Sequence, residues 1–173
     1  MKSVRILAVP LMLVALMLSA RAETLVVLNK SEHTASLIDP ESGKTLSKLP
    51  VGRGPHEVIV SPDGRIAYVS NFGRYGRCPA GDTMCKTPGN TITVLDLVER
   101  KVKTTYDYGS NTGQHGSVIS RDGKLLWVTS ETPQSLLEID TATGRIVNQW
   151  MTKQERSHLV VATSDEKKFY VSN

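Results

Sequence analysis

Hydrophobic and polar positions alternate along this chain in short runs, and residues typical of turns separate these runs. The segment 65–71 is one such run, and Pro62-Asp63-Gly64 and Thr143-Gly144 are two of the turns. Alternation with period two, interrupted by Asp-Gly and Thr-Gly pairs, predicts β-strands joined by tight turns. No stretch beyond residue 22 has the 3.6-residue period of a helix. The pattern predicts an all-β protein.

Three segments of the chain share one register. They cover residues 54–71, 113–130 and 156–173. In each, a histidine lies seven residues before an aspartate, and that aspartate lies five residues before an aromatic residue. The histidines are His56, His115 and His158, and the acidic residues are Asp63, Asp122 and Asp165. A repeat of this kind indicates one structural unit copied along the chain.

A second repeated segment lies between these copies. Residues 34–39, 91–96 and 135–140 each end with an aliphatic residue and an aspartate. Asp96 and Asp140 are 44 residues apart, whereas Asp39 and Asp96 are 57 apart because of an insert around residues 72–90. Four strands in about 40–45 residues is the period of a β-propeller blade.

The residues also resemble a known family. Ser61-Pro62-Asp63-Gly64, followed by Tyr68-Val69-Ser70-Asn71, is similar to the signature of the YVTN (YncE-like) β-propeller repeats. The resemblance implies blades of four antiparallel strands around a central channel, with the strand after each repeated histidine innermost. The resemblance predicts the fold but says little about the activity, because propellers serve many functions.

Placed on such blades, the chain predicts thirteen strands. These make strands two to four of one blade, two full blades at about 55–109 and 114–152, and strands one and two of another. Propellers of this family close at six to eight blades, so we expect residues 23–173 to form a partial propeller of about three blades, a fragment of a longer protein. A single blade buries little surface and is stable only against its neighbours.

Residues 1–22 have the three parts of a secretory signal peptide. Lys2 and Arg5 precede an apolar run from Ile6 to Leu18, and Ala20-Arg21-Ala22 provides a cleavage site. The apolar run is shorter than the ~20 residues that span a bilayer. We therefore expect a periplasmic or secreted protein with no membrane span after cleavage. Most of the formal charge of +4 leaves with this segment. The rest of the sequence has no cluster of basic residues of the kind that binds nucleic acid.

The two cysteines of the chain, Cys78 and Cys85, lie in the insert. In an exported protein this spacing predicts a local disulfide bond. A redox site would more often have Cys-x-x-Cys, and a metal site would need further ligands in the same segment.

The three repeated histidines are the candidate binding residues. At the head of the innermost strand they would lie around the channel mouth, where histidine can ligate a metal, exchange protons or hold an anion. The alternative is that they only pack one blade against the next. Glu57 and Gln114 are the candidate partners next to them. Further polar residues flank the ring: Ser117, Ser157, Asn71 and Glu131.

We expect a wide polar ring, too open for all three histidines to coordinate one metal ion directly, and so predict no metal site from these residues alone. The other repeated positions have structural interpretations. The repeated aspartates belong to turns, Tyr68 and Trp127 pack blade on blade, and His33 lies in a solvated turn.

Two functions follow from the sequence. The first is an exported propeller that binds a small ligand, a metal or a protein partner at the channel mouth. The second is a propeller enzyme, such as a lactonase-like hydrolase or the propeller part of a periplasmic oxidoreductase. The chain has no Gly-x-Ser-x-Gly, His-Glu-x-x-His or Cys-x-x-Cys-His motif, but propeller enzymes often take site residues from several blades, so the cofactor stays unknown and the choice between the two functions stays open.

Overall fold

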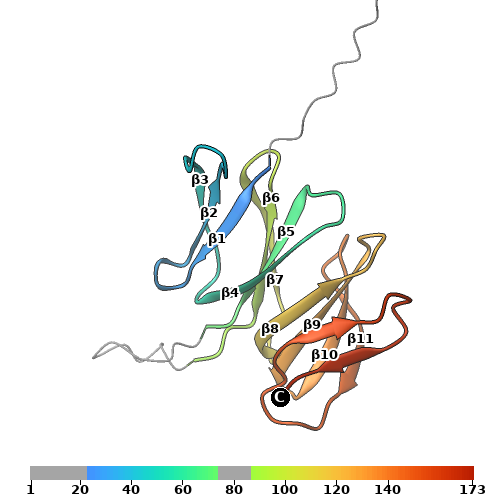
Figure 1. Cartoon of the computed structure of the whole chain (residues 1–173). Helices are drawn as coiled ribbons and strands as arrows, with labels where there is room; N and C mark the ends of the chain where they lie inside the picture. The colour runs from blue at the N-terminus through green and yellow to red at the C-terminus, as the bar shows by residue number, and fades with distance from the viewer. Residues whose placement is uncertain (1–22, 74–86) are drawn as a thin grey trace, which may run out of the picture.

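The computed structural model describes residues 23–73 and 87–173. These residues form thirteen antiparallel strands in four sheets, which follow one another in chain order (Figure 1). The number of strands and their division among the sheets are as the sequence predicts. One difference is a single 3₁₀ turn, η1 (Lys30–Glu32), where we expected no helix.

The first and last sheets are smaller than the middle two. The first has the order β1-β2-β3, and the last has only β12-β13. Their bounds are β1 (Leu25–Asn29), β2 (Thr34–Ile38), β3 (Thr45–Pro50), β12 (Val160–Ala162) and β13 (Phe169–Val171).

The two middle sheets have four strands each, and in each the strand order follows the sequence. The second sheet consists of β4 (Pro55–Val60), β5 (Ile66–Asn71), β6 (Thr91–Asp96) and β7 (Lys101–Asp107). The third consists of β8 (Thr112–Ile119), β9 (Leu125–Thr132), β10 (Ser135–Asp140) and β11 (Ile146–Met151).

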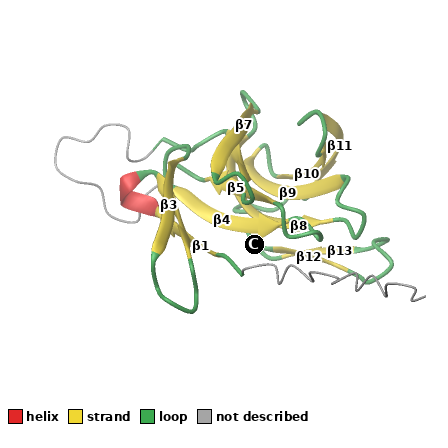
Figure 2. Cartoon of the chain, turned by 90° about the horizontal axis from the view of Figure 1, so that it is seen from above, coloured by secondary structure: helices red, strands yellow, loops and turns green. Residues whose placement is uncertain are grey.

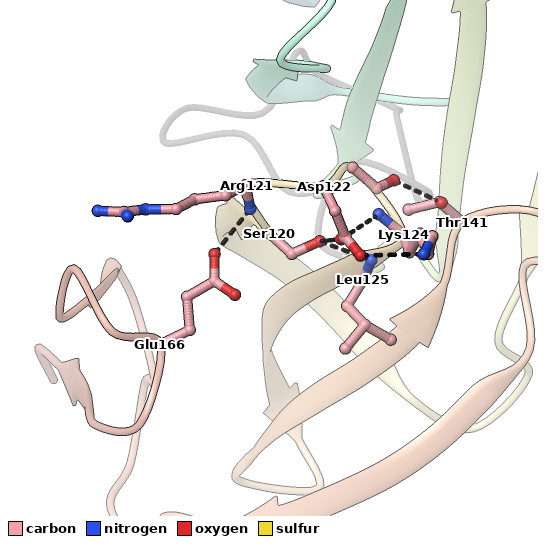
Figure 3. A network of polar contacts seen from close by, with 8 residues as sticks. Ser120, Arg121, Asp122, Lys124, Leu125, Thr141 and Glu166 are labelled. Atoms are coloured by element: carbon pink, nitrogen blue, oxygen red, sulfur yellow. Dashed lines mark hydrogen bonds and ion pairs between the residues drawn. The ribbon is translucent and has the colours of Figure 1, made fainter.

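The turn between the first two strands of a sheet is closed by a repeated polar network, drawn for the third sheet in Figure 3. Asp122 Oδ1 accepts hydrogen bonds from Ser120 Oγ (2.7 Å) and from the backbone N–H of Lys124 (3.0 Å). Ser120 Oγ in turn accepts from the N–H of Leu125 (2.9 Å). The hydroxyl-to-aspartate bond recurs in the other copies, as Ser61–Asp63 and Thr163–Asp165. The structural role predicted for these aspartates is confirmed.

The aspartates that end the third strands also have local roles. Asp39, Asp96 and Asp140 each accept bonds at Oδ1 from backbone N–H groups of the turn that follows. Such side-chain bonds to the following backbone hold a turn without help from a neighbouring sheet.

The core lies between the sheets. Tyr68 of the second sheet is buried in one cluster with Leu126 and Val128 of the third. Trp127, at the same repeat position, packs on Phe169 of the fourth sheet with the ring centroids 4.8 Å apart. The packing role predicted for Tyr68 and Trp127 is therefore confirmed. Tyr170 occupies this position in the last sheet and is 61% exposed.

The first strands of neighbouring sheets meet on one side of the molecule. Strand β4 contacts β8, and β8 contacts β12. Figure 2 shows β4, β8 and β12 along this side, with the later strands of the second and third sheets further from it. This arrangement brings the repeated histidines toward one another.

No helix in residues 23–73 and 87–173 is long and apolar enough to cross a membrane. The predicted signal peptide, residues 1–22, lies outside the described residues. So do Cys78 and Cys85, whose disulfide bond stays a prediction.

Candidate functional site

Three histidines from three different sheets lie in contact. His56 comes from β4, His115 from β8, and His158 from the segment just before β12. The ring centroids of His56 and His115 are 4.2 Å apart, and those of His115 and His158 are 3.8 Å apart. One ring nitrogen from each lies within 4.8 Å of the other two. The expectation of a wide ring, too open for a shared ion, was wrong.

Irregularities in the inner strands explain why the histidines come so close. The pairing of β4 with β5 shifts register between Pro55 and Glu57, and that of β8 with β9 shifts between Gln114 and Ser117. His56 and His115 thus lie at β-bulges, which bend a strand and re-aim its side chains. Alternation alone does not predict where such residues point.

Gly116, the residue after His115, allows the segment that contains His158 to approach β8. The backbone N–H of Gly116 donates to the carbonyl of His158 at 2.9 Å. A Cβ at Gly116 would lie 2.6 Å from that carbonyl oxygen, so a side chain there would push the two strands apart. Glycine is therefore required for His115 and His158 to meet.

Burial differs among the three histidines. His115 is 3% exposed, whereas His56 and His158 are exposed. His115 Nδ1 is buried and has no hydrogen-bond partner among the described residues. A buried nitrogen without a partner costs about 1–3 kcal/mol, so such an atom calls for an explanation.

The surroundings keep two of these rings neutral. Burial, with the neighbouring charges of His56, His158 and Lys30, lowers the pKa of His115 to about 3. Burial and the charge of Lys30 also lower the pKa of His56. Neutral imidazole is the form that ligates metals.

One carboxylate stands beside the cluster. Glu57 Oε1 lies 3.7 Å from His115 Nδ1, which is too long for a hydrogen bond, and because the His115 ring is neutral the two form no ion pair. Burial raises the pKa of Glu57. Of the predicted partners of the histidines, Glu57 is the one that the structure places against them.

The other polar candidates have contacts outside the cluster, although Asn71 Oδ1, Gln114 Oε1 and Tyr108 Oη are, like His115 Nδ1, buried without a hydrogen-bond partner among the described residues. Gln114 is fully buried, and its Nε2 donates to the carbonyl of Asn111 at 2.6 Å. Asn71 donates to Thr91 and Thr93, and Ser157 bonds Thr152. Ser117 pairs with Val128 along β8 and β9, and the side chain of Glu131 lies against Gly113.

His33 is not simply solvated, as we had expected. Its Nδ1 accepts a hydrogen bond from the backbone N–H of Gly54 at 3.2 Å. His33 therefore ties the turn after β1 to the entry of β4, two residues before His56. The His33 ring helps to hold β4 in place and is not a member of the histidine cluster.

The sequence analysis missed two residues of the site. Lys30 Nζ lies 3.4 Å from His56 Nδ1 and 5.4 Å from the centre of the Phe72 ring. Phe72 packs against both His56 (5.3 Å) and His115 (5.0 Å). Lys30 follows β1 and Phe72 follows β5, which occupy the same repeat position, and each comes directly after an asparagine, Asn29 or Asn71. This shared repeat position was the available signal.

Comparison with known proteins supports the architecture. The chain matches no protein-family model and no curated protein. It is similar in structure to Kuenenia stuttgartiensis hydrazine synthase, with a TM-score of 0.70 and 28% identity over 86% of this chain and 40% of that one. It is also similar to dihydro-heme d1 dehydrogenase NirN in complex with DHE, with a TM-score of 0.66 and 18% identity over 87% of this chain and 30% of that one.

The fold is that of β-propeller blades. The chain spans less than half the length of both matched structures. That agrees with the partial propeller expected from the repeats, although the YVTN family itself is not shown by these matches.

Proposed function

We propose that this chain belongs to an exported β-propeller that binds a divalent transition-metal ion through His56, His115 and His158. The observation that carries the proposal is the meeting of three ring nitrogens within 4.8 Å, one of each histidine. The buried, unpartnered Nδ1 of His115 supports it.

The donor set fits such an ion. Imidazole nitrogen suits zinc, copper, nickel and cobalt, and three histidines with one open position is a known zinc arrangement. Nitrogens about 2.0–2.1 Å from a tetrahedral ion lie about 3.4 Å from one another. The three nitrogens already lie within 4.8 Å of one another, and because His56 and His158 are exposed, small side-chain rotations would bring them to that separation.

The fold supports the site by making it depend on three sheets. Each sheet supplies one ligand, so the complete set exists only when the second, third and fourth sheets are packed together. The predicted signal peptide supports an exported protein.

The test is metal binding by the purified, metal-free chain. We expect one Zn²⁺ per chain by isothermal titration calorimetry, and a loss of at least 100-fold in affinity for His115→Ala. His33→Asn is the comparison variant, because it removes the fourth histidine, which supports the site without belonging to the cluster, at a position with φ of 56°, which asparagine tolerates. Its affinity for Zn²⁺ should fall much less than that of His115→Ala.

Equal loss of Zn²⁺ binding in His115→Ala and His33→Asn would indicate that the ion binds to histidines scattered over the surface and not to the cluster. Unchanged Zn²⁺ binding in His115→Ala, together with reduced stability, would show that these rings only pack sheet on sheet, and would contradict the proposal.

A catalytic function is the second candidate. The two structures compared above are, by their names, a synthase and a dihydro-heme d1 dehydrogenase, and the second is in complex with DHE. The lower identity of the second, 18%, supports fold alone. Titration with haem and recording of the Soret band would separate the two functions. A Soret shift lost in His115→Ala, with no Zn²⁺ binding, would favour the haem-type role.

A further inference from the structure

A histidine that holds a metal ion through one ring nitrogen usually donates the N–H of its other nitrogen to a carboxylate, a carbonyl or water. That second partner sets which nitrogen carries the proton and fixes the orientation of the ring. Among the three histidines of the cluster, His115 is the buried one. Its ring is therefore the one whose orientation depends most on the groups packed around it.

The Nδ1 atom of His115 faces a carboxylate. This nitrogen is buried without a hydrogen-bond partner among the described residues, and Glu57 Oε1 lies 3.7 Å from it. An N–H···O bond is about 2.7–3.2 Å long, so the two atoms need to approach by only about 0.5–1 Å. Glu57 is half-buried and lies on an inner strand next to that of His115, so a small rotation of its side chain is enough.

The bulge in β4 brings Glu57 to the cluster. In a regular strand, successive side chains point to opposite faces of the sheet. His56 and Glu57 are successive, yet both lie against the ring of His115, because the pairing of β4 with β5 shifts register between Pro55 and Glu57. A bulge that re-aims a side chain in this way is typical of a functional site.

Glu57 is also a departure from the repeat. The residue after the repeated histidine is Glu57 in the first copy, Gly116 in the second and Leu159 in the third. The cluster thus has three copies of the histidine but one carboxylate at this position, and that carboxylate faces the buried, middle ring. The packing of one sheet on the next does not need an acidic residue here, since the other two copies lack it.

We propose that Glu57 is a positioning residue, whose carboxylate accepts the Nδ1–H of His115 and leaves Nε2 of that ring for the metal ion. This inference rests on the proposed metal-binding function. The bond would give Nδ1 the partner that it lacks among the described residues. A carboxylate that accepts from an imidazole N–H also makes the other ring nitrogen a stronger ligand. Glu57 would therefore raise metal affinity without touching the ion.

The first readout is the position of the proton on His115, measured by NMR on the metal-free chain labelled with ¹⁵N-histidine at pH 7. The His115 signals are those absent from His115→Phe. We expect the proton on Nδ1 in the unmodified chain and a shift of the population toward Nε2–H in Glu57→Ala. On addition of Zn²⁺ to the unmodified chain, the Nε2 signal should change, and Nδ1 should keep its proton.

The second readout is Zn²⁺ affinity by calorimetry. Glu57→Ala should lower it by about 10- to 100-fold, the usual cost of losing such a partner. Glu57→Gln removes the same charge but keeps an oxygen acceptor, so its loss should be less than about 10-fold. Glu41→Ala is the matched control, because it removes an exposed carboxylate in the turn between β2 and β3. It should bind Zn²⁺ as the unmodified chain does.

The outcomes separate the two proposals. If the unmodified chain binds no Zn²⁺, the metal-binding proposal fails and the role of Glu57 fails with it. If Zn²⁺ binds but attaches to Nδ1 of His115, or if Glu57→Ala binds it as tightly as the unmodified chain, the metal site stands and the role of Glu57 is overturned. An equal loss in Glu57→Ala and Glu57→Gln would also overturn it, because the carboxylate would then act through its charge alone.

Discussion

The outer turns and the histidine cluster are built from the same repeat, yet they use it differently. In the turns, each aspartate bonds its own hydroxyl partner and its own backbone, so the three copies act separately. In the cluster, the three histidines contact one another across sheets and form one site. A repeated residue thus acts alone where its bonds are local and acts jointly where the inner strands meet.

The largest expected effect that separates the two regions is on the pH dependence of stability. The pKa of His115 is lowered from 6.5 to about 3, and that of His56 is also lowered. The unfolded chain therefore binds protons below pH 6.5 that the folded chain does not. Stability is complete above pH 6.5 and falls with decreasing pH, by up to about 1.4 kcal/mol per pH unit for each histidine.

Urea unfolding of the metal-free chain between pH 7 and 4.5 measures this slope. His115→Phe keeps an aromatic ring against Phe72 but cannot titrate, so its slope should be shallower. The turn aspartates act in a different range. Hydrogen bonds from Lys124 N–H and Ser120 lower the pKa of Asp122, so the stability it contributes is lost only as pH falls below about 4. If the unmodified chain and His115→Phe lose stability equally per pH unit above pH 4.5, the effect predicted for His115 is contradicted.

A smaller effect is expected from breaking one turn. Ser120→Ala removes the donor to Asp122 and leaves the half-buried N–H of Leu125 without this acceptor. We expect a loss of about 1–2 kcal/mol in the free energy of unfolding, with Zn²⁺ affinity unchanged. Denaturant unfolding and calorimetry on the same sample provide both values. A large fall in metal affinity would show that turns and cluster are not separate.

The fold was predictable from sequence because its determinants are local. Alternation, turn residues and the repeated aspartates predict the number of strands and their sheets. The short distances between the histidines were not predictable from sequence, because they depend on bulges at His56 and His115 and on the contact of β8 with His158. The available sign was Gly116, which stands where the other copies have Glu57 and Leu159.

Lys30 was missed for a related reason. It comes from the first sheet, which has no copy of the repeated histidine, so a search for repeated histidines does not find it. Only the packing of β1 against β4 brings it to His56.

The smallest expected effect concerns the place where a turn does reach its neighbour. Glu166 Oε1 accepts a bond from the backbone N–H of Arg121 in the next sheet at 2.7 Å (Figure 3). Glu166 has φ of 58°, at the repeat position where Gly64 and Gly123 have φ of 71° and 73°. The bond offsets the cost of a left-handed glutamate.

Glu166→Ala should destabilise the chain by about 0.5–1 kcal/mol, because it keeps the left-handed backbone and loses the bond. Glu166→Gln keeps an oxygen acceptor and should be close to neutral. Thermal unfolding of the two variants side by side measures the difference. Equal stability of the two would show that the contact contributes nothing.

The spacing of the histidines along the chain has a consequence for unfolding cooperativity. They are separated by about 40 to 60 residues, so an ion held by all three would close two long loops, as a pair of cross-links does. Each such loop restricts the denatured ensemble by up to about 4 kcal/mol in the chain-entropy account. Stacked repeats otherwise interact only with their nearest neighbours and can separate one at a time. With the ion bound, the second and fourth sheets would be joined directly, and three sheets would come apart in a single transition; after chelation they would be free to come apart in steps.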